Sequence, residues 1–424
     1  MYKDLFSKLF FILFVSFSIF TIIDTQIYKY VYSKPFIFLI IINLIIAIVF
    51  FYKKKRFLIY MNLLVFFISI FIINLFLFFT DPSNPLQSER LKFMDKNNFY
   101  PTVPPITHLG DEIEIIPLSG LSNVDTVTSN ENGYWGTYKS DEFGFNNITN
   151  QHEKILNTKD KKLIFIGDSM TLGSAVYQDE NFVSILNKNP NITALNLGYG
   201  GNGLLLALAS YIEYGKHIEN ANLIFCFYEG NDFFEYEVEE KKHPLLIKYL
   251  GDNFSQNLLN LNEKKDKIVR NKMINQKNRA LKNKNKEKYN LYYKEILQIY
   301  TLRKRLGLLN NKKEMLAYSE ENFNDFEKLL DKYKYLVKQN NSNFIFLYIP
   351  SREHFYLGHP YTDSYNKIIS ILNNKNIEFI DLYSEMKKTG QPLDFYSRKI
   401  MRHFNSNGHK ETSRIITDYF SEKN

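Results

Sequence analysis

The chain has 424 residues, of which 45% are hydrophobic and 16% aromatic, and its formal net charge is +8. This length suffices for more than one folded unit with a buried core. The single cysteine, Cys226, lies in an apolar run and excludes a disulfide scaffold. The lysines concentrate between Lys241 and Lys313, which indicates a solvated helical insert. With no zinc-ligand spacing or RNA-binding signature, the composition indicates no nucleic-acid partner and no metal.

Three apolar runs open the chain, at about residues 5–23, 36–52 and 57–79. A helix needs roughly 20 apolar residues to cross a membrane. The first run lacks a small-residue cleavage site, so we interpret it as a span and not as a signal peptide. The cluster "KKKR" at 53–56 predicts a cytoplasmic loop. The sequence therefore predicts a three-helix transmembrane anchor over 1–80, a cytoplasmic amino terminus, and an exported, extracytoplasmic domain after about Thr80.

Residues 81–160 have a loose pattern with many turn formers, and we expect a linker with short β segments. From residue 161 onward, five apolar strand runs alternate with helical segments. This alternation predicts an α/β domain over 161–424, with a parallel sheet covered by helices on both faces. The predicted strands are 163–167, 192–198, 223–230, 343–350 and 377–382, and the predicted helices are 182–188, 203–217, 321–339 and 361–374.

An insert rich in Lys, Asn and Glu interrupts this domain at about 235–309. Parts of it have a helical pattern and parts are expected to be poorly ordered. We interpret it first as a surface excursion, and a role as a lid or a partner-binding segment stays open.

The stretch "KKLIFIGDSMTLG", residues 161–173, runs from a buried strand directly into a serine flanked by turn formers. A serine on such a turn is exposed and fixed, as a hydroxyl that attacks a carbonyl must be. The tripeptide is nevertheless short, and a helix amino-terminal cap at Ser169 explains it equally well. On this stretch alone, the cap is the favoured interpretation.

Two further polar stretches follow the next two strands, "NLGYGGNG" at 196–203 and "YEGNDF" at 228–233. Carboxyl ends of parallel strands meet at one edge of a sheet, so these stretches converge with Ser169. Closely spaced glycines let backbone N–H groups point into a shared space, although a plain tight turn is the alternative. Asn231 supplies an amide donor, or else an Asx hydrogen bond within the turn. A base could come from His403, just ahead of the last predicted helix.

In order, spacing and flanks, residues 161–424 resemble the SGNH (GDSL-type) hydrolase superfamily. The matching stretches are "IGDSMTLG", "NLGYGGNG", "YEGNDF" and "HFNSNGH". "LYIPSREHFY" and the upstream "SDEFGFNN" are also similar to segments of bacterial members. The resemblance covers about the last 260 residues and leaves the insert unexplained. It implies a flavodoxin-like three-layer fold, in a membrane-anchored bacterial member that needs no cofactor.

Carried over by position, the resemblance makes Ser169 the nucleophile and its own N–H an oxyanion donor. Gly201 and Asn231 match the other oxyanion donors, and His403 matches the general base. His409 matches a position that is structural in the family.

One departure from the family pattern concerns the acid that orients the histidine. The family carries an Asp two or three residues before the base, where this chain has Ile400 and Met401. Three possibilities stay open: a Ser–His dyad oriented by a backbone carbonyl, a displaced acid such as Asp394, or a non-catalytic descendant. We favour the dyad.

The predicted function is an exported serine esterase that removes acyl groups from an envelope glycan or lipid. An O-acyltransferase that modifies a surface polysaccharide through the same acyl-serine is the alternative. Three short spans are too small for an acyl-donor channel, so a transferase would need envelope-assembly partner proteins. A binding protein that retains an inactive site is the third hypothesis.

Overall fold

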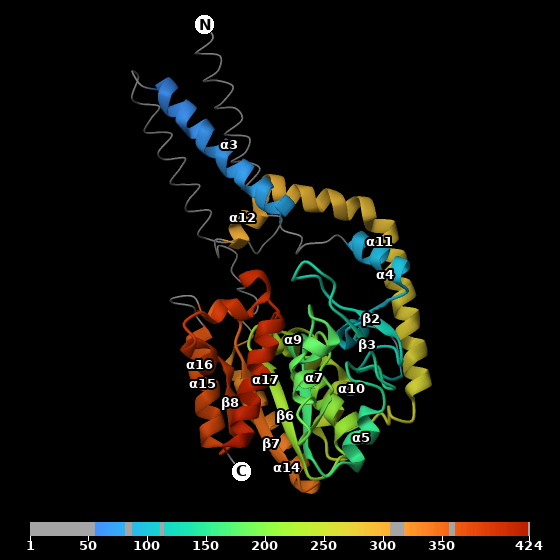
Figure 1. Ribbon diagram of the computed structural model, residues 1–424. Helices are drawn as coiled ribbons and strands as arrows, with labels where there is room; N and C mark the ends of the chain where they lie inside the picture. Colours follow the sequence, from blue (N-terminus) through green and yellow to red (C-terminus); the bar gives the residue numbers. More distant parts are fainter. Residues whose placement is uncertain (1–55, 81–86, 111–113, 306–317, 356–360, 423–424) are drawn as a thin grey trace. The chain divides into compact units, whose positions relative to one another are not determined.

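The computed structural model describes residues 56–80, 87–110, 114–305, 318–355 and 361–422 (Figure 1). These residues divide into two compact units. One unit takes its described residues from Met1–Asp81 and Tyr289–Asn310, and the other from Pro82–Lys288 and Asn311–Asn424.

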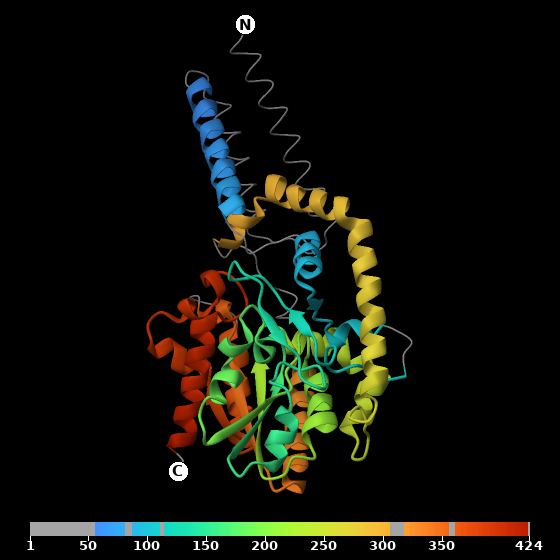
Figure 2. The ribbon, with the colours of Figure 1, turned by 45° about the vertical axis from the view of Figure 1, so that its right-hand side comes forward.

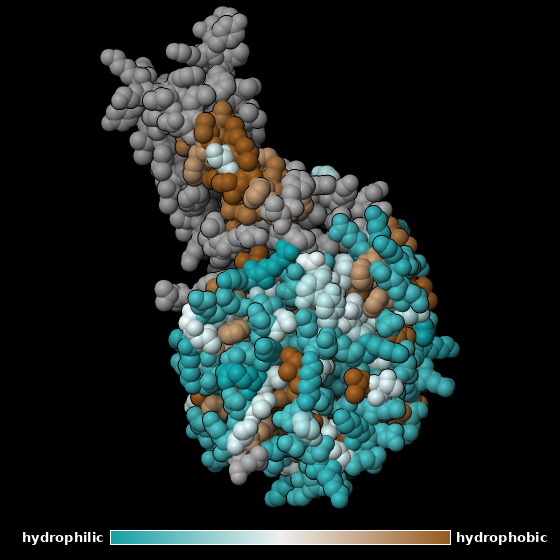
Figure 3. Space-filling model, viewed as in Figure 1, coloured by the Kyte–Doolittle hydropathy of each residue, from teal (hydrophilic) through white to brown (hydrophobic). Residues whose placement is uncertain are grey.

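The first unit contains α3 (Arg56–Thr80) and α12 (Tyr300–Arg305). The third apolar run therefore forms a helix, whereas the first two runs lie outside the described residues. Asn74 is buried within α3, and its Oδ1 accepts a hydrogen bond from the Leu302 N–H at 3.0 Å. Several apolar side chains of α3 are exposed, including Phe76 at 65% (Figure 3). No helix within the described residues combines the length and the apolar character needed to cross a membrane.

The second unit is built on a five-stranded sheet in which every pair of neighbours is parallel, in the order β5-β4-β6-β7-β8. This confirms the predicted parallel sheet. The strands read as nearly continuous apolar runs because both of their faces are covered. Along β4, for example, Ile164 and Ile166 enter one core while Leu163 and Phe165 enter the other. The strands are β4 (Lys161–Gly167), β5 (Ile192–Asn196), β6 (Ala221–Tyr228), β7 (Asn343–Ile349) and β8 (Glu378–Asp381).

Helices cover both faces of this sheet, as predicted (Figures 1 and 2). One core receives side chains from α8 (Leu204–Ser210), α14 (Glu320–Gln339) and α15 (Tyr361–Asn374). The opposite core receives side chains from α7 (Phe182–Leu186), α16 (Leu382–Lys388) and α17 (Ser406–Ser421). The predicted helix at 203–217 ends as a π-helix, η3 (Tyr211–Gly215). Shorter elements are α6 (Ser169–Leu172), α9 (Asp232–Val238), α10 (Pro244–Ile247), η1 (Pro105–His108), η2 (Gln178–Glu180), η4 (Glu240–Lys242), η5 (Lys248–Leu250), η6 (Arg352–Phe355), η7 (Pro392–Phe395) and η8 (Ser397–Lys399).

The segment ahead of the sheet contains α4 (Gln87–Asn97), a small sheet and α5 (Gln151–Asn157). Its sheet has the order β1-β2-β3, with β1 (Tyr100–Pro101), β2 (Asp125–Val127) and β3 (Thr137–Lys139). Buried Asn147 ties the segment to the large sheet, since its side chain accepts from the Asn196 N–H at 2.8 Å and donates to the Asn196 carbonyl at 2.9 Å. Asp141 in turn accepts from the Asn147 amide at 2.8 Å. The region predicted as a linker is thus packed into the same unit as the sheet.

The first part of the insert is also packed into this unit. Glu240 is buried and accepts the N–H groups of Gly203 and Leu205, both at 2.7 Å, at the amino terminus of α8. Glu213 accepts from the Tyr249 hydroxyl at 2.7 Å and from the Gln256 N–H at 2.5 Å. Residues 240–261 are therefore not the surface excursion that the sequence suggested.

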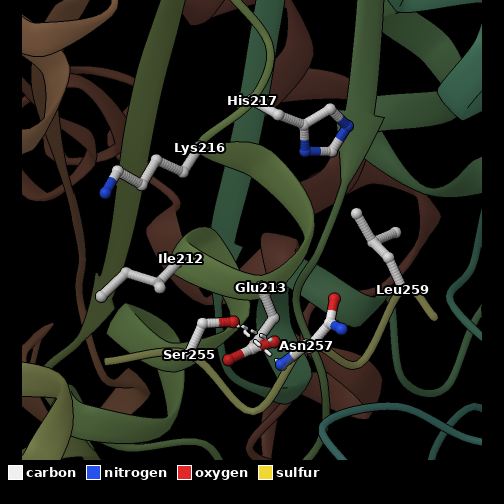
Figure 4. A pocket seen from close by; sticks show the side chains of 7 residues that line it. All are labelled: Ile212, Glu213, Lys216, His217, Ser255, Asn257 and Leu259. Atoms are coloured by element: carbon white, nitrogen blue, oxygen red, sulfur yellow. Dashed lines mark hydrogen bonds between the residues drawn. The ribbon is translucent and has the colours of Figure 1, made fainter. Parts of the chain in front are cut away.

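A pocket of about 320 Å³ opens beside Glu213 (Figure 4). The Ser255 hydroxyl and the Leu258 N–H donate to the second oxygen of this carboxylate, at 3.0 and 2.9 Å. All of these bonds anchor the chain around 249–258, so the carboxylate has a structural role. The pocket is lined by Ile212, Glu213, Lys216, His217, Ser255, Asn257 and Leu259.

The next part of the insert forms one long helix, α11 (Asn262–Gln298), where parts were expected to be poorly ordered. Its lysines, glutamates and leucines are good helix formers, and its first turns gain tertiary contacts (Figure 2). The buried Lys265 ammonium donates to the carbonyls of Gly120 at 2.7 Å and Phe143 at 2.8 Å. Val269 packs with Val103 and Leu121. This end of α11 therefore braces the segment ahead of the sheet.

Candidate active site

Three of the polar stretches predicted to converge follow neighbouring strands of the sheet. Ser169 follows β4, which pairs with the edge strand β5 on one side and with the central strand β6 on the other. Gly201 follows β5 and Asn231 follows β6. Ligands gather at such a carboxyl edge, where the strand order reverses. His403 reaches this edge from the loop between η8 and α17.

Ser169 is not the residue that caps the helix after β4. The cap is Asp168, whose side chain accepts the Met170 N–H at 2.8 Å. Ser169 is then the first helical residue, and its Oγ lies 2.8 Å from Nε2 of His403. The structure thus separates the two interpretations of this stretch, because the aspartate takes the capping role and leaves the serine hydroxyl for the histidine.

The histidine is oriented by Glu131, a residue that the sequence analysis did not single out. Oε1 of Glu131 lies 2.8 Å from Nδ1 of His403, and Oε2 accepts the His403 backbone N–H at 3.1 Å. With Nδ1 donating to the carboxylate, Nε2 is an acceptor for the Ser169 hydroxyl. Glu131, His403 and Ser169 therefore form a continuous acid–base–nucleophile arrangement.

Glu131 lies in the loop between β2 and β3, and that loop is docked on the segment that follows Ser169. The Asn132 amide donates to the Ala175 carbonyl at 2.9 Å, and the Thr128 hydroxyl accepts the Ala175 N–H at 3.2 Å. The Tyr134 and Tyr177 rings stack with their centroids 4.7 Å apart. These contacts fix the loop from which Glu131 reaches the histidine. A sequence signal was absent, because "TSNENGYWG" carries no periodicity and lies far from the serine motif.

Asp394 does not occupy the position proposed for a displaced acid. Its carboxylate is 42% exposed and pairs with the Lys399 ammonium at 2.5 Å. Only its backbone carbonyl supports the histidine loop, by accepting from the Asn405 amide at 2.8 Å. The favoured alternative, a backbone carbonyl on Nδ1 of His403, also differs from the structure, since Glu131 holds that nitrogen.

The charges around His403 favour its protonated form. Burial lowers the pKa of the imidazole, but the Glu131 carboxylate and then Asp168 raise it, so the pKa lies above the ordinary value of 6.5. Burial likewise raises the pKa of the Asp168 carboxyl, whose Oδ2 lies 3.2 Å from the Ser169 Oγ. An imidazole that takes the serine proton is therefore stabilised as an imidazolium by the carboxylate behind it.

The glycine turn after β5 lies against the serine. A carbon added to Gly200 would be 4.0 Å from Cβ of Ser169, and one added to Gly201 would be 2.9 Å from Cγ2 of Ile106. Gly201 also has a φ of +75°, which disfavours any side chain. Within the described part of the chain, the N–H groups of Gly200 and Gly201 donate to no backbone acceptor. They are thus available to a ligand, and the oxyanion role of Gly201 stays a prediction.

Among the described residues, the Asn231 side chain makes no hydrogen bond to the backbone of the turn in which it lies. The Asp232 carboxyl holds that turn by accepting the Tyr228 N–H at 2.9 Å. Asn231 makes no side-chain cap on α9, and its buried Oδ1 has no partner among the described residues. Its Nδ2 donates to Oε1 of Glu235 at 3.3 Å. The Asx-turn alternative is therefore not realised, which leaves the amide available for chemistry.

His409 lies apart from this arrangement, as the resemblance implied. It is buried, its ring stacks on Phe182 with centroids 5.9 Å apart, and burial lowers its pKa to about 3. It is a neutral core residue.

The described residues contain no group of three or more His, Cys, Asp or Glu that could hold a metal ion.

No protein-family model matches the chain, and no curated protein matches it. Solved structures with a similar fold include a member of the lipolytic G-D-S-L family from Veillonella parvula (TM-score 0.34, 13% identity, 62% of this chain and 98% of that chain). Others are a lipase/acylhydrolase from Enterococcus faecalis (0.33, 11%, 62% and 96%) and the acetylxylan esterase Axe2 from Geobacillus stearothermophilus (0.31, 17%, 60% and 92%). Since the TM-scores are below 0.5, the functional assignment depends on the geometry of the site.

Proposed function

We propose that this protein is a serine esterase in which Ser169 is the nucleophile, His403 the general base and Glu131 the orienting acid. The observation that carries the proposal is the chain of contacts from Glu131 to Nδ1 of His403 and from Nε2 to the Ser169 hydroxyl, both 2.8 Å long. A solely structural histidine would not need its two nitrogens aligned between a carboxylate and a hydroxyl. The same contacts favour a working site over a non-catalytic descendant.

Catalysis begins when the Ser169 oxygen attacks the ester carbonyl and its proton passes to Nε2 of His403. The resulting oxyanion accepts hydrogen bonds from the N–H groups of Ser169 and Gly201 and from the Asn231 amide. Collapse of this intermediate breaks the ester bond, and His403 returns the proton to the leaving alcohol. Water, deprotonated by His403, then attacks the acyl-serine, and His403 returns that proton to the Ser169 oxygen as the bond to the acyl group breaks and the carboxylic acid leaves. Glu131 holds the imidazole in the required tautomer throughout.

The proposed substrates are acyl groups on an envelope glycan or lipid, and the proposed location is the extracytoplasmic face of a membrane. The three apolar runs and the "KKKR" cluster support this topology. The exposed apolar side chains of α3, such as Val65 at 56%, suit contact with lipid. An acyltransferase would share the acyl-serine step and differ only in resolving it with a sugar hydroxyl.

Labelling of the full chain with a fluorophosphonate tests the proposal. We expect a single phosphonylated residue, Ser169, by mass spectrometry, and hydrolysis of short-chain aryl esters by the same preparation. Ser169→Ala should lose both while the protein stays folded, since the change removes one half-buried hydroxyl and its contacts with His403 and Asp168. Equal ester turnover in that variant would overturn the serine mechanism. Adding an oligosaccharide acceptor distinguishes the transferase, which would form an acylated sugar in place of free acid.

A further inference from the structure

Among the described residues, the Asn231 side chain has one hydrogen-bond partner, Glu235, which lies one helical turn further along α9. Nδ2 donates to Oε1 of Glu235 at 3.3 Å, and the Glu235 N–H donates to the Asn231 carbonyl at 2.8 Å. The Asn231 Oδ1 is buried and accepts no hydrogen bond from any described group. The orientation of this amide therefore depends on Glu235.

The chemistry of the two groups determines which way the amide faces. An ionised carboxylate only accepts hydrogen bonds, so it selects the NH₂ end of the amide and rejects the oxygen. One N–H of Nδ2 is then used by Glu235, and the other remains for a second acceptor. If the amide turned over, Asn231 would present a carbonyl oxygen to the oxyanion, which is repulsive.

We propose that Glu235 is a positioning residue, which holds the Asn231 amide so that its second N–H faces the developing oxyanion. This inference rests on the esterase function proposed above. Glu235 does not contact the substrate, and its effect passes entirely through Asn231.

The surroundings of Glu235 make the orientation of the Asn231 amide dependent on pH. Burial is the largest influence on its carboxyl and raises the pKa to about 7. The charges of Asp168 and Glu239 also raise this pKa, whereas the Asn231 hydrogen bond and the charge of Arg402 lower it. Below that pH the protonated carboxyl can donate to Oδ1 of Asn231, and the amide is no longer held in one orientation. The acid limb of the rate profile should then report two protonations, one on His403 and one on Glu235.

Three variants test the proposal in the full chain with an aryl ester. Glu235→Leu removes the acceptor, and we expect kcat to fall by about 10- to 100-fold with KM little changed, less than the 100- to 1000-fold cost of losing a whole oxyanion donor. Glu235→Gln, like the protonated carboxyl, can donate to Oδ1 of Asn231, so kcat should be lowered at every pH and not only at low pH. Glu237→Gln is the matched control on the same helix, because Glu237 pairs with Lys241 and should not affect kcat.

A double-mutant cycle separates positioning from a general structural effect. In the Asn231→Ala background, Glu235→Leu should have no further effect on kcat. The Glu235→Gln variant should also show an acid limb with a slope of one in log kcat against pH, whereas the slope of the wild type should exceed one over the pH range in which Glu235 is protonated. An equal loss of kcat in both backgrounds, or an unchanged slope, would contradict the proposal. Absence of fluorophosphonate labelling in the wild type would instead contradict the esterase function itself.

Discussion

Glu131 and His403 are 272 positions apart in the chain, and their side chains meet at 2.8 Å. The carboxylate that orients the histidine comes from the loop between β2 and β3, ahead of the whole sheet domain. Ile400 and Met401 occupy the positions at which the resemblance implied an acid, and Glu131 supplies a carboxylate from another segment of the chain. The region ahead of the sheet is therefore part of the site, in addition to any role as a connection.

The most direct test of this relationship compares Glu131→Gln with Asp394→Asn. Replacing Glu131 removes both control of the tautomer and the charge that stabilises the imidazolium. In a serine triad of another fold the corresponding change lowers kcat by about 10,000-fold, and we expect a loss of about 1000-fold or more here. Asp394→Asn should retain wild-type kcat, since that carboxylate pairs with Lys399. Equal losses in the two variants, measured by ester hydrolysis, would contradict the assignment of Glu131.

The pH dependence of activity follows from the raised pKa of His403. The base must be neutral, so kcat falls as the pH drops through the pKa, and the acid limb should be centred above 6.5. Glu131→Gln removes the strongest raising influence and leaves burial, which lowers the pKa. The limb of its residual activity should therefore move to lower pH, and a shift toward higher pH would be inconsistent with the structure.

Substitutions at the adjacent residues Asn231 and Asp232 should affect different properties: kcat for Asn231, and the free energy of unfolding for Asp232. Asn231→Ala removes one oxyanion donor, which we expect to lower kcat by about 100- to 1000-fold with KM and thermal stability little changed. Asp232→Ala leaves the buried Tyr228 N–H without its acceptor and should lower the free energy of unfolding by about 1–3 kcal/mol. Denaturant unfolding and steady-state kinetics on both variants check the expectation. Loss of stability alone in Asn231→Ala would favour a turn role.

Lys265 tests whether the beginning of α11 is a structural brace. Lys265→Met keeps the length of the side chain but removes the hydrogen bonds to the Gly120 and Phe143 carbonyls, of which the latter keeps the Ser119 hydroxyl as a donor. We expect the free energy of unfolding to fall by about 1–3 kcal/mol. Lys267→Met on the same helix is the control, because Lys267 is exposed. Matching stabilities for the two variants would show that the brace is dispensable.

The proposed membrane topology is tested with reporter fusions after Thr80. Because 53–56 should stay in the cytoplasm, an alkaline phosphatase fused there should be active and a fluorescent protein that folds only in the cytoplasm should be dark. The same pair of reporters fused after Arg56 should give the opposite result. Cytoplasmic signals at both positions would remove the exported location while leaving the esterase proposal untouched.

The local sequence determined the sheet domain almost completely. Apolar runs of five to eight residues, ended by glycine-rich turns, can only be buried as parallel strands between two helical layers, and the five strands lie where the runs predict. The residues gathered at the carboxyl edge followed from the same reasoning, because consecutive strands of such a sheet end on one side. The gathering of Ser169, Gly201 and Asn231 at one edge was therefore predictable, whereas their proposed roles, and that of His403, came from the resemblance.

Only the tertiary structure decided the partners of these residues. A hydrogen bond between side chains that lie hundreds of positions apart leaves no periodicity or spacing in the sequence, and a glutamate in a polar loop has the same local context as a solvated one. For this reason Glu131 was not predicted, whereas Asp394, near in sequence, was considered as a possible acid beside the favoured dyad. The capping role of Asp168 and the contact of Glu235 with Asn231 were hidden in the same way, because each depends on side-chain directions that are set only once the chain is packed.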